Sequence, residues 1–108
     1  MKSKYDYLLN KIDFLLCTLE DLIDPNPDTA DYAARVLGGH VDLFLDAARP
    51  FTEYRRFRAG LFRLGIIRDR VHNGEPVEDE RVWDVIDTLE DFKIKVVSDK
   101  LKEGIHLK

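Results

Sequence analysis

The sequence predicts an all-α protein that folds as an antiparallel four-helix bundle. Four segments place apolar residues every three or four positions, and no stretch alternates apolar and polar residues with the period of a strand. Proline, asparagine or glycine separates these segments, so each connection is only a few residues long. Short connections place consecutive helices antiparallel to one another. The length of 108 residues fits one domain, which we expect to span residues 1–108.

The first predicted helix covers residues 3–23. Its apolar residues form the continuous stripe that is typical of a helix with one buried face. The sequence DPNPD at positions 24–28 ends this helix, because proline lacks the backbone N–H that continues the hydrogen-bond ladder. Asn26 is the predicted N-cap of the second helix, with Pro27 at its first position.

The second predicted helix covers residues 27–48. His40 falls on its apolar stripe, which favours a hydrogen-bonded core histidine. The pair Gly38–Gly39 lies inside the helix, where each glycine costs about 1 kcal/mol. We therefore expect this pair to permit a close approach of another helix or a kink.

The third and fourth predicted helices cover residues 51–72 and 78–101. Asn73–Gly74 is a typical stop signal for the third helix. The fourth helix begins with a cluster of acidic residues and ends among lysines, which is the order that the helix dipole favours.

Positive charge is concentrated in the middle of an acidic chain. The net charge is −4, yet residues 49–70 carry seven arginines against Glu53 and Asp69. Two interpretations stay open. The arginines pair with acidic residues of neighbouring helices, or they form a local surface for an anionic ligand, since the planar guanidinium suits phosphates and carboxylates.

Four apolar residues of the fourth helix lie off its main stripe: Trp83, Ile94, Val97 and Leu101. Such a set is typical of a protein interface, most simply that of a two-fold homodimer. The alternative is a broader core face inside a single chain.

Several classes of site find no support in the sequence. A single cysteine, Cys17, excludes a disulfide framework and a cysteine-based zinc site, and the three histidines are far apart in the chain. We expect no metal and no cofactor. No apolar run approaches the ~20 residues that span a membrane. With no apolar leader after Met1, this favours a cytoplasmic protein without membrane contact.

One segment carries a candidate site. Arg68, Asp69 and His72 are followed by Asn73–Gly74 at the end of the third helix. This segment resembles the Arg/His signature of HEPN domains, which are small all-α proteins. The Val71–Gly74 turn matches closely, whereas the spacing between Arg68 and His72 is one residue shorter than the family's minimum. The resemblance covers residues 50–101 loosely.

The resemblance implies a metal-independent endoribonuclease, or a relative that only binds RNA, in a toxin–antitoxin or phage-defence setting. His72 would be the general base or acid, because imidazole exchanges protons near neutral pH. Arg68 would contact the phosphate, since i and i+4 share one side of a helix, and Asp69 would orient one of the two. The predicted additional RNA contacts are Arg63, Arg70 and Arg56.

Other interpretations stay open for the same residues. His72 can cap the last carbonyls of its helix, and Arg68 can form an ion pair with an acid of the fourth helix. The whole chain can instead be a non-enzymatic acidic adaptor or inhibitor that binds a protein partner, either an antitoxin or a target.

Overall fold

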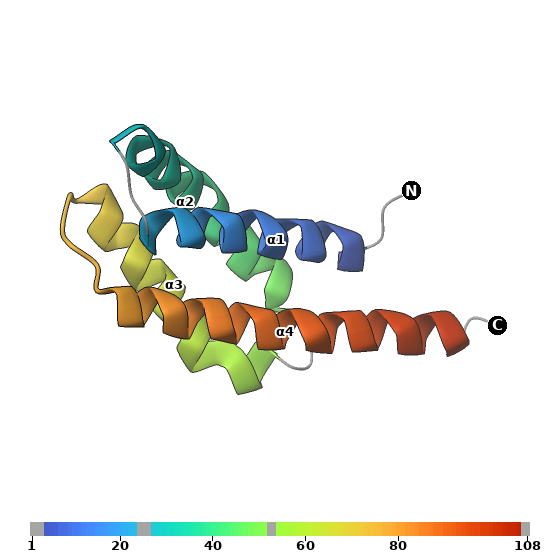
Figure 1. Cartoon of the computed structure of the whole chain (residues 1–108). Helices are drawn as coiled ribbons and strands as arrows, with labels where there is room; N and C mark the ends of the chain where they lie inside the picture. Colours follow the sequence, from blue (N-terminus) through green and yellow to red (C-terminus); the bar gives the residue numbers. More distant parts are fainter. Residues whose placement is uncertain (1–3, 24–26, 52–53, 107–108) are drawn as a thin grey trace.

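The prediction of an all-α four-helix bundle is confirmed. The computed structural model describes residues 4–23, 27–51 and 54–106. These residues form four helices and no strand: α1 (Lys4–Ile23), α2 (Pro27–Ala48), α3 (Tyr54–His72) and α4 (Asp79–His106) (Figure 1). None of the described helices combines the length and the apolarity that crossing a lipid bilayer requires.

The helices form a closed ring. α1 packs against α2 and α4, and α3 packs against the same two helices, whereas the backbones of the diagonal pairs of described helices stay apart. Consecutive helices run antiparallel, so α1 begins and α4 ends at the same end of the bundle (Figure 1). The α3–α4 connection lies at the opposite end, which separates it from both chain termini.

The core consists of the stripe residues that the sequence predicts. Leu15 and Leu61, for example, are fully buried. Three phenylalanine rings from different helices meet at the centre: Phe92 lies 6.1 Å from Phe44 and 5.5 Å from Phe57, both edge-to-face. Burying one such side chain contributes about 1.5–3 kcal/mol, so these rings fix how the helices pack.

Two helix boundaries differ from the predictions by more than one residue. α3 begins at Tyr54 instead of residue 51, since Phe51 N–H bonds to the Ala48 carbonyl at 3.0 Å in a turn that follows α2. α4 continues to His106, five residues beyond the predicted end. Just before the predicted end, Lys100 Nζ donates to Asp6 of α1 at 2.5 Å.

The end of α3 has the geometry of a Schellman motif. Gly74 adopts a φ of 72°, in the left-handed region. Its N–H bonds to the Val71 carbonyl at 3.2 Å, and the Glu75 N–H bonds to the Arg70 carbonyl at 2.8 Å. The predicted stop at Asn73–Gly74 is confirmed, and backbone groups cap this helix.

The predicted close approach at Gly38–Gly39 is wrong. Both glycines are exposed, and a Cβ atom at either position would meet nothing within 4 Å. The close approach occurs instead at Gly60 of α3, where an added Cβ would lie 2.5 Å from Thr88 Cγ2 of α4. The predicted N-cap, Asn26, lies outside the described residues.

Candidate functional site

Most arginines of α3 are free of ion pairs. The helix carries six arginines and one acidic residue, Asp69. Among the described residues, only Arg68 of these six forms an ion pair. The five others make no ion pair and no hydrogen bond through their side chains: Arg55, Arg56, Arg58, Arg63 and Arg70.

Arg68 is held by two carboxylates. Its Nη1 donates to Asp42 of α2, and its Nε donates to Asp69 at 3.1 Å. Burial lowers the pKa of this guanidinium, but the hydrogen bonds and charges of Asp69 and Asp42 outweigh burial and raise it. The prediction of an ion pair for Arg68 is correct, but its interhelical partner lies on α2 rather than α4. Asp69 does contact Arg68, as expected of an orienting residue.

His72 is exposed at the last position of α3 and has no hydrogen-bond partner among the described residues. Its side chain does not cap the helix, because the N–H groups of Gly74 and Glu75 already bond to the last carbonyls, those of Val71 and Arg70. His72 follows Arg68 by four residues and so shares its side of α3, toward α2. An exposed imidazole of this kind is available to a substrate from solution.

The outward side of α3 combines arginines with exposed apolar residues. Five residues with helical spacing form this surface, which we call the arginine face: Arg55, Arg58, Phe62, Arg63 and Ile66. They line a broad groove of about 940 Å³ between α2 and α3. Phe62 is 69% exposed, the largest value among the large apolar side chains that the structure describes. An aromatic ring flanked by cations is therefore presented to solvent.

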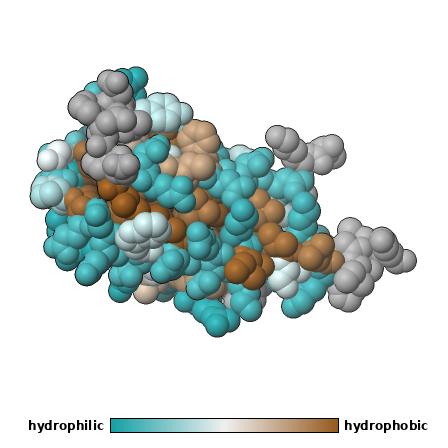
Figure 2. All heavy atoms as spheres, viewed as in Figure 1, coloured by the Kyte–Doolittle hydropathy of each residue, from teal (hydrophilic) through white to brown (hydrophobic). Residues whose placement is uncertain are grey.

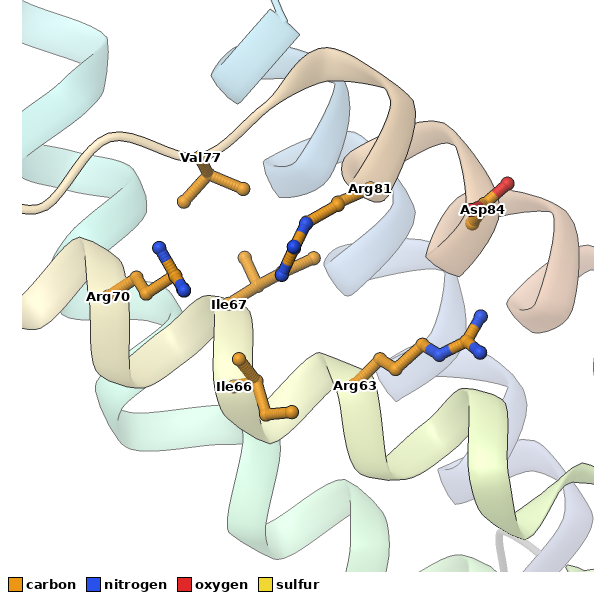
Figure 3. Close-up of a pocket in the computed structure, with 7 residues that line it drawn as sticks. All are labelled: Arg63, Ile66, Ile67, Arg70, Val77, Arg81 and Asp84. Carbon is orange, nitrogen blue, oxygen red and sulfur yellow. The ribbon is translucent and has the colours of Figure 1, made fainter.

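A second hollow, the α3–α4 pocket, lies on the other flank of α3. It has a volume of about 380 Å³, and its lining comes from α3, α4 and Val77 of the connection between them (Figure 3). Arg81 extends from α4 toward α3, between Arg70 on one side and Arg63 on the other. Asp84 is the one carboxylate of the lining. The guanidinium groups of Arg70 and Arg81 therefore point toward each other, whereas that of Arg63 extends away from them at the edge of the same space (Figure 3).

The structure separates the predicted site residues into two groups. Arg68 and Asp69 are in contact, with His72 one turn beyond, whereas Arg63 and Arg70 line the α3–α4 pocket. The predicted RNA contact Arg56 belongs to neither hollow, and its guanidinium lies 5.9 Å from the centre of its neighbour's ring, Phe57. Sequence reasoning missed Arg81, which joins Arg63 and Arg70 from another helix.

The four predicted interface residues are all accessible on the outward side of α4. Trp83, Ile94, Val97 and Leu101 are 48%, 64%, 36% and 63% exposed, and we call this set the outer face of α4. Figure 2 shows apolar atoms gathered over the C-terminal half of the helix. The alternative of a broader single-chain core is wrong, because none of the four is buried.

His40 is half-buried and hydrogen bonded, close to its prediction. Its Nδ1 lies 2.8 Å from Lys11 Nζ, and its ring packs 5.0 Å from that of Phe14. The Lys11 ammonium has only donors, so His40 Nδ1 accepts. His40 therefore belongs to the α1–α2 contact.

Comparisons with known proteins give no relative for this chain. No family model, no curated protein and no solved structure matches it. Among the residues that the structure describes, no three His, Cys, Asp or Glu side chains gather as a group that could hold a metal ion.

Proposed function

We propose that this protein is a HEPN-like RNA-binding protein that holds single-stranded RNA on the arginine face. The observation that carries the proposal is the set of arginines without ion pairs on α3, in a protein whose net charge is negative. Phosphate contacts by such groups supply most of the affinity of non-specific nucleic-acid binding. The acidic remainder of the chain directs a polyanion to this one surface.

The apolar residues of the arginine face favour single strands over duplexes. Phe62 is 69% exposed, with Arg58 and Arg63 on neighbouring turns. A base stacked on an aromatic side chain contributes about 1–3 kcal/mol, and an unpaired strand offers its bases for stacking. Ile66, one turn beyond Phe62 and 37% exposed, extends the apolar strip.

Binding to a single-stranded RNA of mixed sequence, followed by fluorescence anisotropy at several salt concentrations, tests the proposal. We expect Arg58→Gln to weaken binding and to reduce the slope of log affinity against log salt by about 0.7, the value for one lost phosphate contact on a single strand. The matched control is Arg35→Gln, because Arg35 is an exposed arginine of α2 away from both hollows. Equal effects of the two variants would reject the arginine face.

A second comparison tests stacking. Phe62→Ala should weaken RNA binding about 5-fold or more, as the lower end of the stacking energies implies. Tyr32→Ala is the control, since Tyr32 is another exposed aromatic residue, on α2 and 55% exposed. DNA of the same sequence provides the last comparison, and equal affinity for it would reject RNA as the preferred partner.

Cleavage would depend on Arg68 and His72, which are not part of the arginine face. His72 is accessible, but Asp42 and Asp69 already neutralise Arg68, and a phosphate brought to this guanidinium meets two negative groups. Two of the five guanidinium N–H donors are used in these bonds, which leaves donors for a phosphate. We therefore place RNA binding on the arginine face and assign any cleavage to Arg68 and His72.

A second proposed property is self-association through the outer face of α4. The first half of α4 is acidic, whereas its second half carries four lysines against two acidic residues. Lys93 and Lys100 pair with Asp13 and Asp6 of α1, and Lys95 and Lys102 form no ion pair with the described residues. An antiparallel two-fold pairing of two α4 helices places the acidic half of each against the lysine-rich half of the other. A second copy of this chain therefore complements the face in charge as well as in apolarity.

Sedimentation velocity tests this pairing. Ile94→Asp should convert a dimer to a monomer, because it places a charge in an apolar contact. Leu43→Asp is the control, since Leu43 is similarly accessible, 47% exposed, but lies on α2. A parent protein that sediments as a monomer at tens of micromolar would reject the pairing.

A further inference from the structure

The residues that line the α3–α4 pocket carry a net positive charge. Arg63, Arg70 and Arg81 contribute three positive charges, and Asp84 contributes one negative charge. None of the three arginines forms an ion pair or a hydrogen bond with another described residue. Like charges held around a small space repel one another, and a bound anion relieves that repulsion.

The net charge of the pocket lining is opposite in sign and similar in size to the charge of a phosphate monoester. The net charge of the lining is +2, since three arginines face one carboxylate. A phosphate monoester carries a charge of about −1.5 to −2 at neutral pH, whereas each internal phosphodiester of RNA carries only −1. Guanidinium groups also suit phosphate oxygens in geometry, because two parallel N–H donors match two oxygens.

The pocket also has room and chemistry for more than the phosphate. Its volume of about 380 Å³ corresponds to roughly a dozen water molecules at ~30 Å³ each, well beyond the five heavy atoms of a phosphate group. Ile66, Ile67 and Val77 form apolar walls, against which a flat base can pack. The Asp84 carboxylate can accept hydrogen bonds from sugar hydroxyls or from an amino group of a base.

We infer that the α3–α4 pocket binds the terminal phosphate of a nucleotide, with Arg70 and Arg81 on the phosphate and Arg63 at the edge of the site. The nucleotide is either a free nucleoside monophosphate or the phosphorylated end of an RNA chain. This site is distinct from the pair Arg68 and His72, which lies toward α2. This inference does not depend on RNA binding by the arginine face, because a free nucleotide can occupy the pocket as well as the end of an RNA chain.

NMR titration, which detects weak binding, provides the first test, with the four nucleoside 5′-monophosphates and the corresponding nucleosides as probes. We expect at least one monophosphate to bind 10-fold or more tightly than its nucleoside. Arg81→Gln should weaken that binding about 10-fold or more, since a hydrogen bond to a charged group contributes about 1.5–3 kcal/mol. Arg35→Gln, the same charge change at a distant exposed site, should leave it unchanged.

Inorganic phosphate is the probe that isolates the charge of the site. Asp84→Asn should strengthen its binding, because the variant removes the one negative charge of the lining. Arg81→Gln should weaken it. Equal affinity of nucleosides and monophosphates, or equal effects of Arg81→Gln and Arg35→Gln, would overturn the inference.

A third arm distinguishes the two sources of the phosphate. A short single-stranded RNA is prepared with a phosphate or a hydroxyl at its 5′ end. If the RNA end is the ligand, the phosphorylated form binds more tightly, and Arg81→Gln removes the difference without changing the affinity for the hydroxyl form. If a free nucleotide is the ligand, the two RNAs bind alike while the monophosphate binds. If neither phosphorylated probe binds better than its unphosphorylated counterpart, the inference is rejected.

Arg63 lines both the α2–α3 groove and the α3–α4 pocket, so variants of residues that line only one of them separate this inference from the proposed function. Loss of RNA binding in Arg58→Gln concerns the arginine face, because Arg58 does not line the α3–α4 pocket. Arg81→Gln concerns the pocket, because Arg81 does not line the α2–α3 groove. RNA binding on the arginine face can therefore be rejected while phosphate binding in the α3–α4 pocket holds, and the reverse.

Discussion

Replacing Gly60 with alanine perturbs a close contact between α3 and α4. The new Cβ would lie 2.5 Å from Cγ2 and 2.7 Å from Oγ1 of Thr88. Carbon atoms in favourable contact are about 3.5–4.0 Å apart, so the overlap is about 1 Å. Thr88 is held where it is, because its hydroxyl donates to the Asp84 carbonyl at 2.9 Å and its branched side chain has few rotamers in a helix.

The expected effect on stability is the difference between two terms. Overpacking of this kind costs about 1–3 kcal/mol, whereas alanine is favoured over glycine in a helix by about 1 kcal/mol. Gly60→Ala should therefore lower the free energy of unfolding by about 1 kcal/mol. Gly38→Ala makes the same chemical change where the Cβ meets nothing within 4 Å. This control should raise the free energy of unfolding by about 0.5–1 kcal/mol.

Urea denaturation followed by circular dichroism measures both variants. The difference between them isolates the clash, since the helix propensity term is common to both. Adding Thr88→Ala to Gly60→Ala should recover most of the loss, because the nearest remaining atom is then Thr88 Cβ, 3.1 Å away. Stabilisation by Gly60→Ala equal to that by Gly38→Ala would refute the packing argument. Gly60→Ala should also weaken nucleotide binding, because the distance between α3 and α4 shapes the α3–α4 pocket.

Three further outcomes are expected. Leu15→Ala and Leu61→Ala, both fully buried, should each cost about 2–5 kcal/mol in urea denaturation; a loss below 1 kcal/mol would contradict their burial. A hydrogen bond to Glu103, together with burial, raises the pKa of Tyr5 from 10.0 to about 12, so ultraviolet titration should show a late tyrosine step that Glu103→Gln shifts to lower pH. Because this pKa is higher in the folded state, its contribution to stability is complete below pH 10 and is lost as the pH rises to about 12. In an RNA-cleavage assay, His72→Ala should reduce the rate at least ~10²-fold without changing the free energy of unfolding, and an unchanged rate would exclude His72 as the general base.

The helices could be predicted from the sequence because their apolar periodicity is strong and their breaks are explicit. Asn73–Gly74 predicted the end of α3 for a sound physical reason, since Gly74 adopts the positive φ that a Schellman motif requires. The prediction of a close helix approach at Gly38–Gly39 was wrong, because a glycine pair indicates such a contact only when it lies on the side of the helix that faces a neighbour. Gly60 lies on the buried side of α3, and its role follows from that position.

The candidate site was predicted only in part, for reasons of helix geometry. Arg68 and Arg70 are two positions apart, which places them about 200° apart around a helix and so on opposite flanks of α3. This angle follows from the sequence alone and was enough to predict that Arg68 and Arg70 face different neighbouring helices. Arg81 could have been found from the antiparallel turn, because it lies about as far after the α3–α4 connection as Arg70 lies before it. The partner of Arg68, Asp42, depends on which helix occupies each flank, which a single sequence does not specify.

The ring of helix contacts has a consequence for how the chain folds. Each helix packs against the one that follows it, and the α1–α4 contact joins the helices that are farthest apart in the chain. Chains dominated by such local contacts have a low contact order and fold within microseconds to milliseconds. Ring closure carries the larger entropic cost, because it brings together the two ends of a long loop. Residues 63–84, which contain the whole lining of the α3–α4 pocket, form a single helical hairpin. The pocket can therefore assemble before the ring around it has closed.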